Sequence, residues 1–446
     1  MQVSRLKQWL LILSLLTPIS VFADEVISKA QELVKAGDYK AAYELLEPLE
    51  TERSGNVEYD MLLGISGVQA GENSRGIFAL ERVLAIEPNN IEARAMIAKG
   101  YYRAGEADNA KNEFNNVLSQ KPNPEITKLV ESNMLAIDKA TGQTTAFAAY
   151  LDMGIGYDSN INAATSNSTV NGVNPIVSLT ALTPIALTAN SREQGSYFVN
   201  AAAGISVRAP ITKDLAAFGS LNGTNKTNWS NEQFDTSSLD YSVGLNLKHN
   251  IDSYTLALQG GSFAVDTNTF REAIGVSGQW QRDLDDRNQV SVFTQISDLS
   301  YPDISARDSK RYIVGGGWGH SFEGDKAKTI YITGYGGKEK TDDSTFDFLS
   351  NDIYGVRVGG QLAINYKLVA FAAASYEYRD YDKQDPSFLK TRSDDQYDFN
   401  IGLRYLPGNN FTIKPQLSYV DNRSNIDLFE FDRFILSLNI RKDFNW

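Results

Sequence analysis

The sequence predicts an N-terminal all-α domain of helical repeats followed by an all-β, transmembrane antiparallel barrel of about 14 strands. Three observations predict this fold class. The N-terminal third repeats every 34 residues, and the chain ends in an alternating strand closed by Trp446. Between them, after Thr144, the hydrophobic period changes from about 3.6 residues to about 2. The predicted parts are a signal at 1–23, the repeat domain at 24–142 and the barrel at 143–446.

The first residues have the features of a secretory signal. Arg5 and Lys7 form a charged region, an apolar run follows from Trp9 to Leu16, and Val21-Phe22-Ala23 is a small-residue cleavage site. The apolar run is only about ten residues long, whereas a helix must cross roughly 30 Å of hydrocarbon. We therefore expect this segment to be removed on export, leaving a mature chain that begins at Asp24.

Composition excludes several classes of function. The chain has no cysteine, which excludes disulfides, thiolate metal sites and a catalytic thiol. Its formal net charge is −13, and nucleic-acid binding depends on an excess of basic side chains, so no nucleic-acid partner is expected.

The 34-residue repeat resembles the tetratricopeptide repeat, in which each unit is a pair of antiparallel helices. The pairs Ala36-Gly37, Ala70-Gly71 and Ala104-Gly105 recur at this spacing, and their glycines suit the end of a first helix. Gly67 and Gly76 replace larger residues usual in the repeat, which indicates a looser middle unit. Positions on the first helices of the repeats are the candidates for binding a partner protein, called the client below: Met61, Ile65, Glu92, Lys99 and Tyr102. The alternative is a helical array without a peptide groove.

Strict alternation after Thr144 predicts strands with one face toward lipid and one toward water. The segment Tyr354 to Tyr366 shows it most clearly, because Arg357 on a lipid face would cost roughly 2 to 4 kcal/mol at mid-membrane and must therefore point inward. Fourteen such segments are centred near residues 151, 202, 220, 243, 258, 275, 293, 316, 332, 360, 374, 401, 416 and 438.

The predicted connections alternate in length, which indicates orientation. Connections after even-numbered strands are short, such as Asn250 to Ser253, and those after odd-numbered strands are mostly long, such as Ser159 to Gln194 and Asp380 to Asp395. Short turns face the periplasm in bacterial barrels. The pattern predicts an outer-membrane barrel with its N-terminal domain in the periplasm.

Polar residues of the barrel are candidates for the lumen. Asp152, Arg357, Gln361, Asn439 and Arg441 fall on inward positions of the alternation. The segment Gly156 to Ala164, where the first strand enters the longest loop, adds the final lumen candidates Asp158, Asn160 and Asn162. These Asp and Asn residues can also simply turn the backbone through local hydrogen bonds. Apolar stretches in this loop, Pro175-Ile176-Val177 and Leu182 to Leu187, must be covered by the lumen, a ligand or the barrel rim.

A search for chemistry gives no catalytic site, metal site or cofactor site. The two histidines, His249 and His320, continue outward-facing series, and Ser321 points to the opposite face from His320. Metalloprotease, P-loop and nucleophile-elbow motifs are lacking, and acidic pairs such as Asp342-Asp343 are expected to be solvated turns. We predict no enzyme, no cofactor and no bound metal.

The whole mature chain resembles the surface lipoprotein assembly modifiers, the Slam family. The similarity is best in Tyr157 to Asn162 and near the end of the chain, in Ser418-Tyr419, Asp432-Arg433 and Arg441 to Phe444. The resemblance implies a repeat domain, a 14-stranded barrel, and delivery of lipoproteins or haem-acquisition proteins to the cell surface. The ending Phe444-Asn445-Trp446 and the compact repeat domain depart from the family pattern.

These features together predict an outer-membrane translocon or assembly factor. Its expected partners are a client lipoprotein or secreted haem-acquisition protein, a periplasmic chaperone, outer-membrane lipid, and the barrel-assembly machinery, which the terminal aromatic strand would engage. The alternatives are a porin with a periplasmic docking domain and a polysaccharide exporter.

Overall fold

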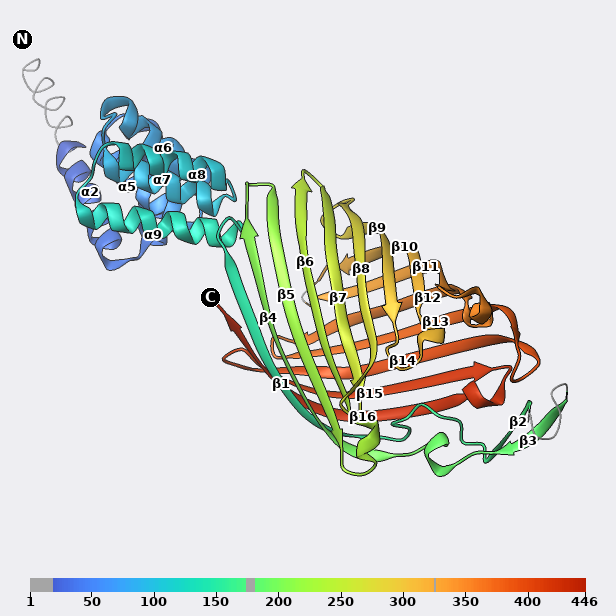
Figure 1. The fold of residues 1–446 in the computed structure, drawn as a ribbon. Coiled ribbons are helices and arrows are strands. Elements are labelled where there is room, and N and C mark those ends of the chain that lie inside the picture. Colours follow the sequence, from blue (N-terminus) through green and yellow to red (C-terminus); the bar gives the residue numbers. More distant parts are fainter. Residues whose placement is uncertain (1–18, 174–180, 325) are drawn as a thin grey trace, which may run out of the picture. The chain divides into compact units, whose positions relative to one another are not determined.

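The computed structural model describes residues 19–173, 181–324 and 326–446, and it divides into two compact units, residues 1–144 and 145–446 (Figure 1). Arg5, Lys7 and the run from Trp9 to Leu16 lie outside the described residues, so the secretory signal stays a prediction. The loop segment Pro175-Ile176-Val177 lies outside them as well.

The first unit is a series of antiparallel helices whose apolar core consists of three clusters of buried residues. Its helices are α2 (Ile19–Ala36), α3 (Tyr39–Leu46), α4 (Glu50–Arg53), α5 (Val57–Ala70), α6 (Asn73–Ile86), α7 (Ile91–Arg103), α8 (Ala107–Ser119) and α9 (Pro124–Ala140). None of the helices in the described part of the chain is long and apolar enough to cross a membrane.

Repeated caps explain why these helices begin and end at a regular spacing. Asn56, Asn90 and Asn123 stand before α5, α7 and α9, and each side chain accepts a hydrogen bond from a backbone N–H of the first turn. Gly71 ends α5 with φ of 103°, in the left-handed region that favours glycine, and Gly105 follows α7 with φ of 85°. The predicted helix-ending role of the Ala-Gly pairs is confirmed.

The middle repeat differs from the expected looser packing. A Cβ on Gly76 would lie 2.6 Å from the backbone nitrogen of Val68, and one on Gly67 would lie 3.1 Å from the Cα of Gly76. The two glycines therefore let the backbones of α5 and α6 meet more closely than side chains would allow. Small residues here give a tight helix crossing.

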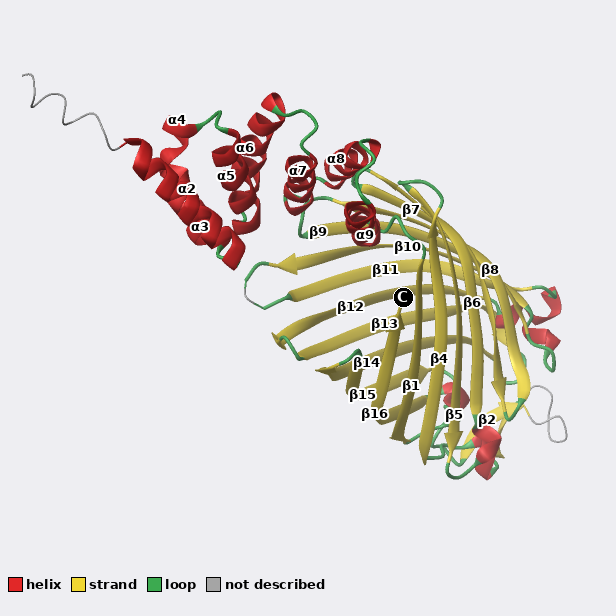
Figure 2. Ribbon diagram, turned by 90° about the vertical axis from the view of Figure 1, so that its left-hand side faces the viewer, coloured by secondary structure: helices red, strands yellow, loops and turns green. Residues whose placement is uncertain are grey.

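The second unit is a closed barrel in which every strand pairs antiparallel with its two neighbours (Figure 2). Its strands in chain order are β1 (Ala146–Asp158), β4 (Ser196–Pro210), β5 (Leu215–Asn228), β6 (Thr236–His249), β7 (Asp252–Val265), β8 (Asn268–Asp283), β9 (Asn288–Ser300), β10 (Ser309–Phe322), β11 (Lys328–Thr341), β12 (Asn351–Asn365), β13 (Leu368–Asp385), β14 (Lys390–Gly408), β15 (Phe411–Ser424) and β16 (Phe431–Asn445). The predicted fold class is confirmed: helical repeats precede a closed 14-stranded barrel.

The connection between β13 and β14 was wrongly predicted. We expected a loop from Asp380 to Asp395, whereas the two strands continue as a long hairpin to Asp385 and resume at Lys390. The pairing shifts register between Asp380 and Gln384, where the strands continue past the polar residues that suggested a loop. We call this end of the barrel, where the longer connections gather, the loop end, and the opposite end the turn end.

The long loop after β1 contains a hairpin that the alternation did not predict, formed by β2 (Thr169–Val173) and β3 (Leu182–Ala186). The backbone N–H of Val173 donates to the carbonyl of Ser387, in the turn between β13 and β14, at 2.7 Å. This hydrogen bond attaches the hairpin to the barrel's rim, whereas Leu182 of the predicted apolar stretch is 39% exposed.

Alternating side chains give the barrel an apolar outer face and a polar inner wall. Leu151 and Met153 are 54% and 64% exposed on the outer face of β1, while Asp152 between them points inward to a hydrogen-bonding partner. His320 lies on the outer face of β10, stacked on Trp318 and edge-on to Phe322, in the aromatic belt where it was expected.

We predict that Gly76→Ala destabilises the helical unit by about 1–3 kcal/mol, because the added methyl collides with backbone rather than with a movable side chain. Thermal unfolding followed by the helical circular dichroism signal measures this. Ser74→Ala, at an exposed position on the same helix, is the control and leaves the transition in place. Equal transitions for the two variants would contradict the tight crossing.

Candidate functional site

A buried ion cluster stands at the loop end of the barrel, around Asp158 at the end of β1. This carboxylate is fully buried and accepts from Arg433 of β16 at 2.6 and 3.0 Å and from the Lys226 ammonium of β5 at 2.5 Å. The Lys226 ammonium also lies 4.6 Å from the ring centre of Phe198, on the intervening strand β4. One aspartate thus joins three strands next to the closure of the barrel.

Asn160 and Asn162 lie beyond the end of β1 and anchor the long loop. The amide of Asn160, itself fully buried, donates to the carbonyls of Ala164 and Asp432, both at 2.9 Å. The amide of Asn162 donates to the carbonyl of Arg192 at 2.7 Å and thereby joins the two arms of the loop. Both side chains bond backbone groups of the rim, as local turn-forming residues do.

Polar side chains continue along the inner wall beside the closure of the barrel. The amide of Asn439 on β16 donates to Asp152 on β1 at 2.6 Å. The Arg441 guanidinium lies 3.8 Å from the ring centre of Tyr150 and donates to Asp443. Asp152, Asn439 and Arg441 therefore face the interior together, across the seam between the first and last strands.

The opposite part of the wall carries Arg357 and Gln361, both on β12. The Gln361 carbonyl accepts from Arg404 of β14 at 2.5 Å. Arg357 lies between Thr333 of β11 and Ser375 of β13, and it lines two recesses of the inner wall. Its inward position agrees with the register expected from the cost of an arginine in lipid.

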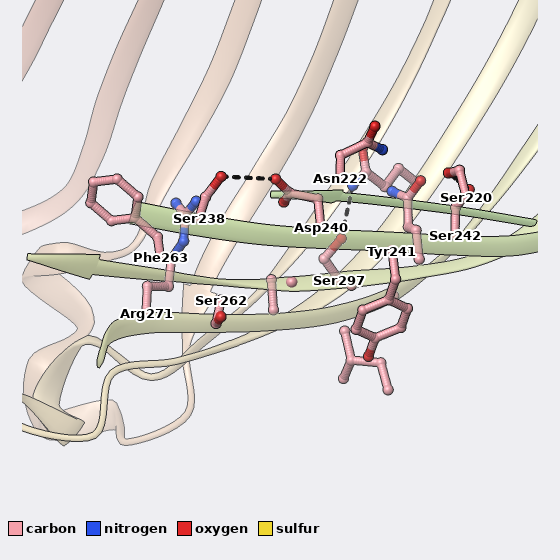
Figure 3. Close-up of a pocket in the computed structure, with 17 residues that line it drawn as sticks. Ser220, Asn222, Ser238, Asp240, Tyr241, Ser242, Ser262, Phe263, Arg271 and Ser297 are labelled. Atoms are coloured by element: carbon pink, nitrogen blue, oxygen red, sulfur yellow. Dashed lines mark hydrogen bonds between the residues drawn. The ribbon is translucent and has the colours of Figure 1, made fainter. Parts of the chain in front are cut away.

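A neutral recess of about 550 Å³ lies on the inner wall of β5–β9 (Figure 3). Hydroxyl and amide groups dominate its lining, among them Ser220, Asn222, Ser242 and Ser297, and the Ser238 hydroxyl donates to Asp240 at 3.1 Å. Such a surface forms many weak hydrogen bonds with water or with a polar solute.

The described residues contain no group of three or more His, Asp or Glu side chains that could hold a metal ion. On the inner wall, the hydroxyls of Ser220 and Ser242 bond each other, Ser238 bonds Thr224 and Asp240, and Ser297 accepts from the Gln295 amide. The arrangement can bind, orient or exclude polar material.

The five candidate positions of the helical unit lie on α5 and α7. Met61 packs against the second core cluster and Ile65 is half-buried, whereas Glu92 and Tyr102 are exposed. The Lys99 ammonium on α7 donates to Gln69 of α5 at 3.0 Å, and burial, together with nearby Arg103, lowers the pKa of Lys99. Lys99 thereby links the two helices that carry the candidates.

The helical unit also contains a buried charge that the repeat pattern did not indicate. Asp60 on α5 is fully buried and accepts two hydrogen bonds from Arg82 of α6, at 2.6 and 3.0 Å, and one from the Gly55 backbone. Beside it, burial raises the pKa of Tyr59, whose hydroxyl donates to the carbonyl of Leu46 at 2.7 Å. The sequence signal for this buried ion pair was an Asp and an Arg 22 residues apart, on two helices that the repeat predicts to pack together.

A closed barrel with an apolar outer face and a polar inner wall defines the class of outer-membrane β-barrel proteins. A profile of the surface lipoprotein assembly modifiers matches residues 148–444, and one of the tetratricopeptide repeat matches residues 67–132. This chain belongs to the surface lipoprotein assembly modifier family, as the resemblance implied. It therefore has a role in lipoprotein assembly at the outer membrane, and both matched families are non-enzymatic.

No curated protein matches the chain. Among solved structures, the type III secretion chaperone SycD of Yersinia enterocolitica is 18% identical over 29% of this chain and 93% of its own, with a TM-score of 0.26. PcrH, in complex with the chaperone binding region of PopD, is 12% identical over 28% and 96%, with a TM-score of 0.25. An anion-selective porin from Comamonas acidovorans is 9% identical over 68% and 99%, with a TM-score of 0.38.

We predict that Asp60→Asn destabilises the helical unit by about 1–3 kcal/mol, because the partly buried Arg82 guanidinium loses its fully buried charge partner and keeps only Glu50. Chemical unfolding of the helical circular dichroism signal measures the change. Glu47→Gln, which removes a carboxylate from the exposed pair with Arg75, shifts the unfolding free energy by about 0–1 kcal/mol at most. Similar shifts in both variants would refute the role of the buried pair.

For the barrel, we predict that Asp158→Asn lowers stability by about 3–5 kcal/mol, since Lys226 and Arg433 then repel each other without a carboxylate between them. The heat-induced mobility shift of the folded barrel in detergent gels reports the loss. Asp421→Asn, which breaks a more exposed ion pair with Arg423, is the control. An unchanged Asp158→Asn midpoint would show that the cluster does not stabilise the barrel.

Proposed function

We propose that this protein is an outer-membrane translocon that delivers lipoproteins or related client proteins from the periplasm to the cell surface. The family match over residues 148–444 carries the proposal, because it spans the barrel itself. The polar inner wall supports it, since a hydrated polypeptide can pass hydroxyl, amide and charged groups without a large desolvation cost.

In this proposal the turn end faces the periplasm and the helical unit lies on the same side. Short turns face the periplasm in bacterial barrels, and the helical unit ends at Thr144, immediately before the start of β1 at Ala146. The helical unit captures a client or its periplasmic chaperone through Met61, Ile65, Glu92, Lys99 and Tyr102. Half-buried apolar side chains beside exposed charges on two adjacent helices suit a peptide segment.

The client then follows the lumen, along Asp152, Arg357, Gln361, Asn439 and Arg441, or leaves through the seam between β1 and β16. The outer membrane has neither ATP nor a proton gradient, so folding or capture of the client outside must drive passage. The client is a lipoprotein or a secreted haem-acquisition protein. The barrel-assembly machinery would insert the translocon itself, recognising the aromatic end of β16.

We expect that deletion of the gene removes a specific lipoprotein from the cell surface while its total cellular amount is maintained. Surface labelling of intact cells, followed by proteomics, measures this and names the client. Complementation with the Lys99→Glu chain restores less surface exposure than the wild type, because the α5–α7 link is broken and a positive charge is reversed. The matched control is Lys128→Glu at an exposed position on α9.

The rival functions predict other outcomes of the same experiment. A porin would leave the surface proteome unchanged, reduce uptake of small solutes on deletion, and conduct steadily in planar bilayers. A polysaccharide exporter would lose surface polymer rather than surface protein. Either result, with full expression of the chain, would overturn the proposed delivery of protein clients.

A further inference from the structure

Basic side chains form a continuous stripe along one half of the inner wall, although the chain as a whole carries a net charge of −13. The stripe crosses three neighbouring recesses on the wall formed by β8–β15. Arg271 and Arg311 both line the two recesses that lie nearer the loop end. Arg357 lines one of these two and also the third recess, which lies toward the turn end. Arg404 and Lys414 line that third recess as well.

The charge of these recesses is unbalanced. Four arginines and Glu377 are the charged residues among the described lining of the central recess, which holds about 720 Å³. In the recess at the loop end, five arginines accompany Glu339. The recess toward the turn end is lined by Arg357, Arg404 and Lys414, with no carboxylate among the described residues that line it.

Some of these cations already have partners and others do not. Arg311 is paired with Glu339, Arg379 with Glu377, and Arg392 with Asp394. These three arginines therefore form ion pairs within the wall. Within the described residues, Arg271, Arg357 and Lys414 form no hydrogen bond or ion pair. Each of the three recesses contains at least one of them. These free cations are the groups that can bind a ligand.

The recess on β5–β9 is more balanced in charge. Its charged lining residues are Asp240 and Arg271, and the strand of Asp240, β6, lies across the closed ring from β13. The excess of positive charge is therefore greatest along β8–β15, and low-dielectric walls increase its attraction for an anion.

The length of the stripe indicates the size of the ligand. Arg392 and Arg404 line its two ends and are both on β14, separated by about 40 Å of strand at roughly 3.3 Å per residue. A small anion would occupy a single recess. An extended polypeptide of about twelve residues could contact all three.

We propose that the β8–β15 wall is a binding track for an acidic, extended polypeptide segment, held by Arg271, Arg357 and Lys414. The inference rests on the proposed function in one respect only: it takes the lumen to admit protein clients. Carboxylates spaced along such a segment would pair with the free cations in turn, and the paired arginines would keep the wall rigid. A client with an acidic segment would thereby be guided lengthwise through the barrel.

The test uses the full-length protein in detergent and a fluorescent Glu-rich peptide of about twelve residues, with binding followed by anisotropy at low salt. We expect saturable binding that weakens as salt rises, and no binding of a Lys-rich peptide of equal length. Arg357→Gln combined with Arg271→Gln should weaken binding roughly tenfold or more, because two charge-assisted contacts are lost. Neither change removes a hydrogen bond or an ion pair found among the described residues.

The matched control is Lys340→Gln, which removes one positive charge from the outer face of β11 and should leave peptide affinity unchanged. Absence of binding, or equal affinity in the Arg357→Gln and Lys340→Gln variants, overturns the track. Displacement of the peptide by equal concentrations of inorganic phosphate would assign a small-anion site instead. Tighter binding of polygalacturonate than of the peptide would assign an anionic sugar polymer instead.

The outcome is separable from that of the proposed function. If the peptide binds at the track while deletion leaves surface lipoproteins unchanged, the track stands and protein delivery fails. If deletion removes a surface lipoprotein but the peptide does not bind, delivery stands and the track fails.

Discussion

Pairing of β1 with β16 is the interaction on which the barrel depends. It runs from Ala148 opposite Asn445 to Asp158 opposite Ile435, and it satisfies the backbone groups that would otherwise form two open edges in lipid. The strongest side-chain contacts of the inner wall gather at the same place. Asp158 and Asp152 each bond a residue of β16, so the closure is held by backbone and side chains together.

The two units solve the problem of buried polar groups in different ways. In the helical unit an apolar core excludes water, and the exceptional charge, Asp60, is completely enclosed with Arg82. The barrel reverses this arrangement, because its apolar side chains face outward and many of its charges face the lumen. Charges on the outer face lie near strand ends: Lys340 is next to the last residue of β11, and the ammonium of Lys442 on β16 reaches the backbone carbonyl of Asn409 at the turn end.

Sequence patterns predicted what depends on local periodicity. All fourteen predicted strand centres fall within barrel strands, and the cost of Arg357 in lipid set the register of β12 correctly. The β2–β3 hairpin was missed because its strands are short and pair with each other outside the barrel sheet. The link from Asp158 to Arg433 joins residues 275 positions apart, and periodicity carries no information on such a contact.

Because the last strand in the chain completes the ring with the first, no shortened product of translation can reach the native topology. A polypeptide that stops before Phe431 lacks β16, and the backbone N–H and C=O groups of β1 and β15 that pair with β16 would then have no partner strand. The closed barrel therefore forms only from a chain that includes β16. An incomplete chain of this kind would expose two unpaired strand edges, on which other chains can pair and aggregate.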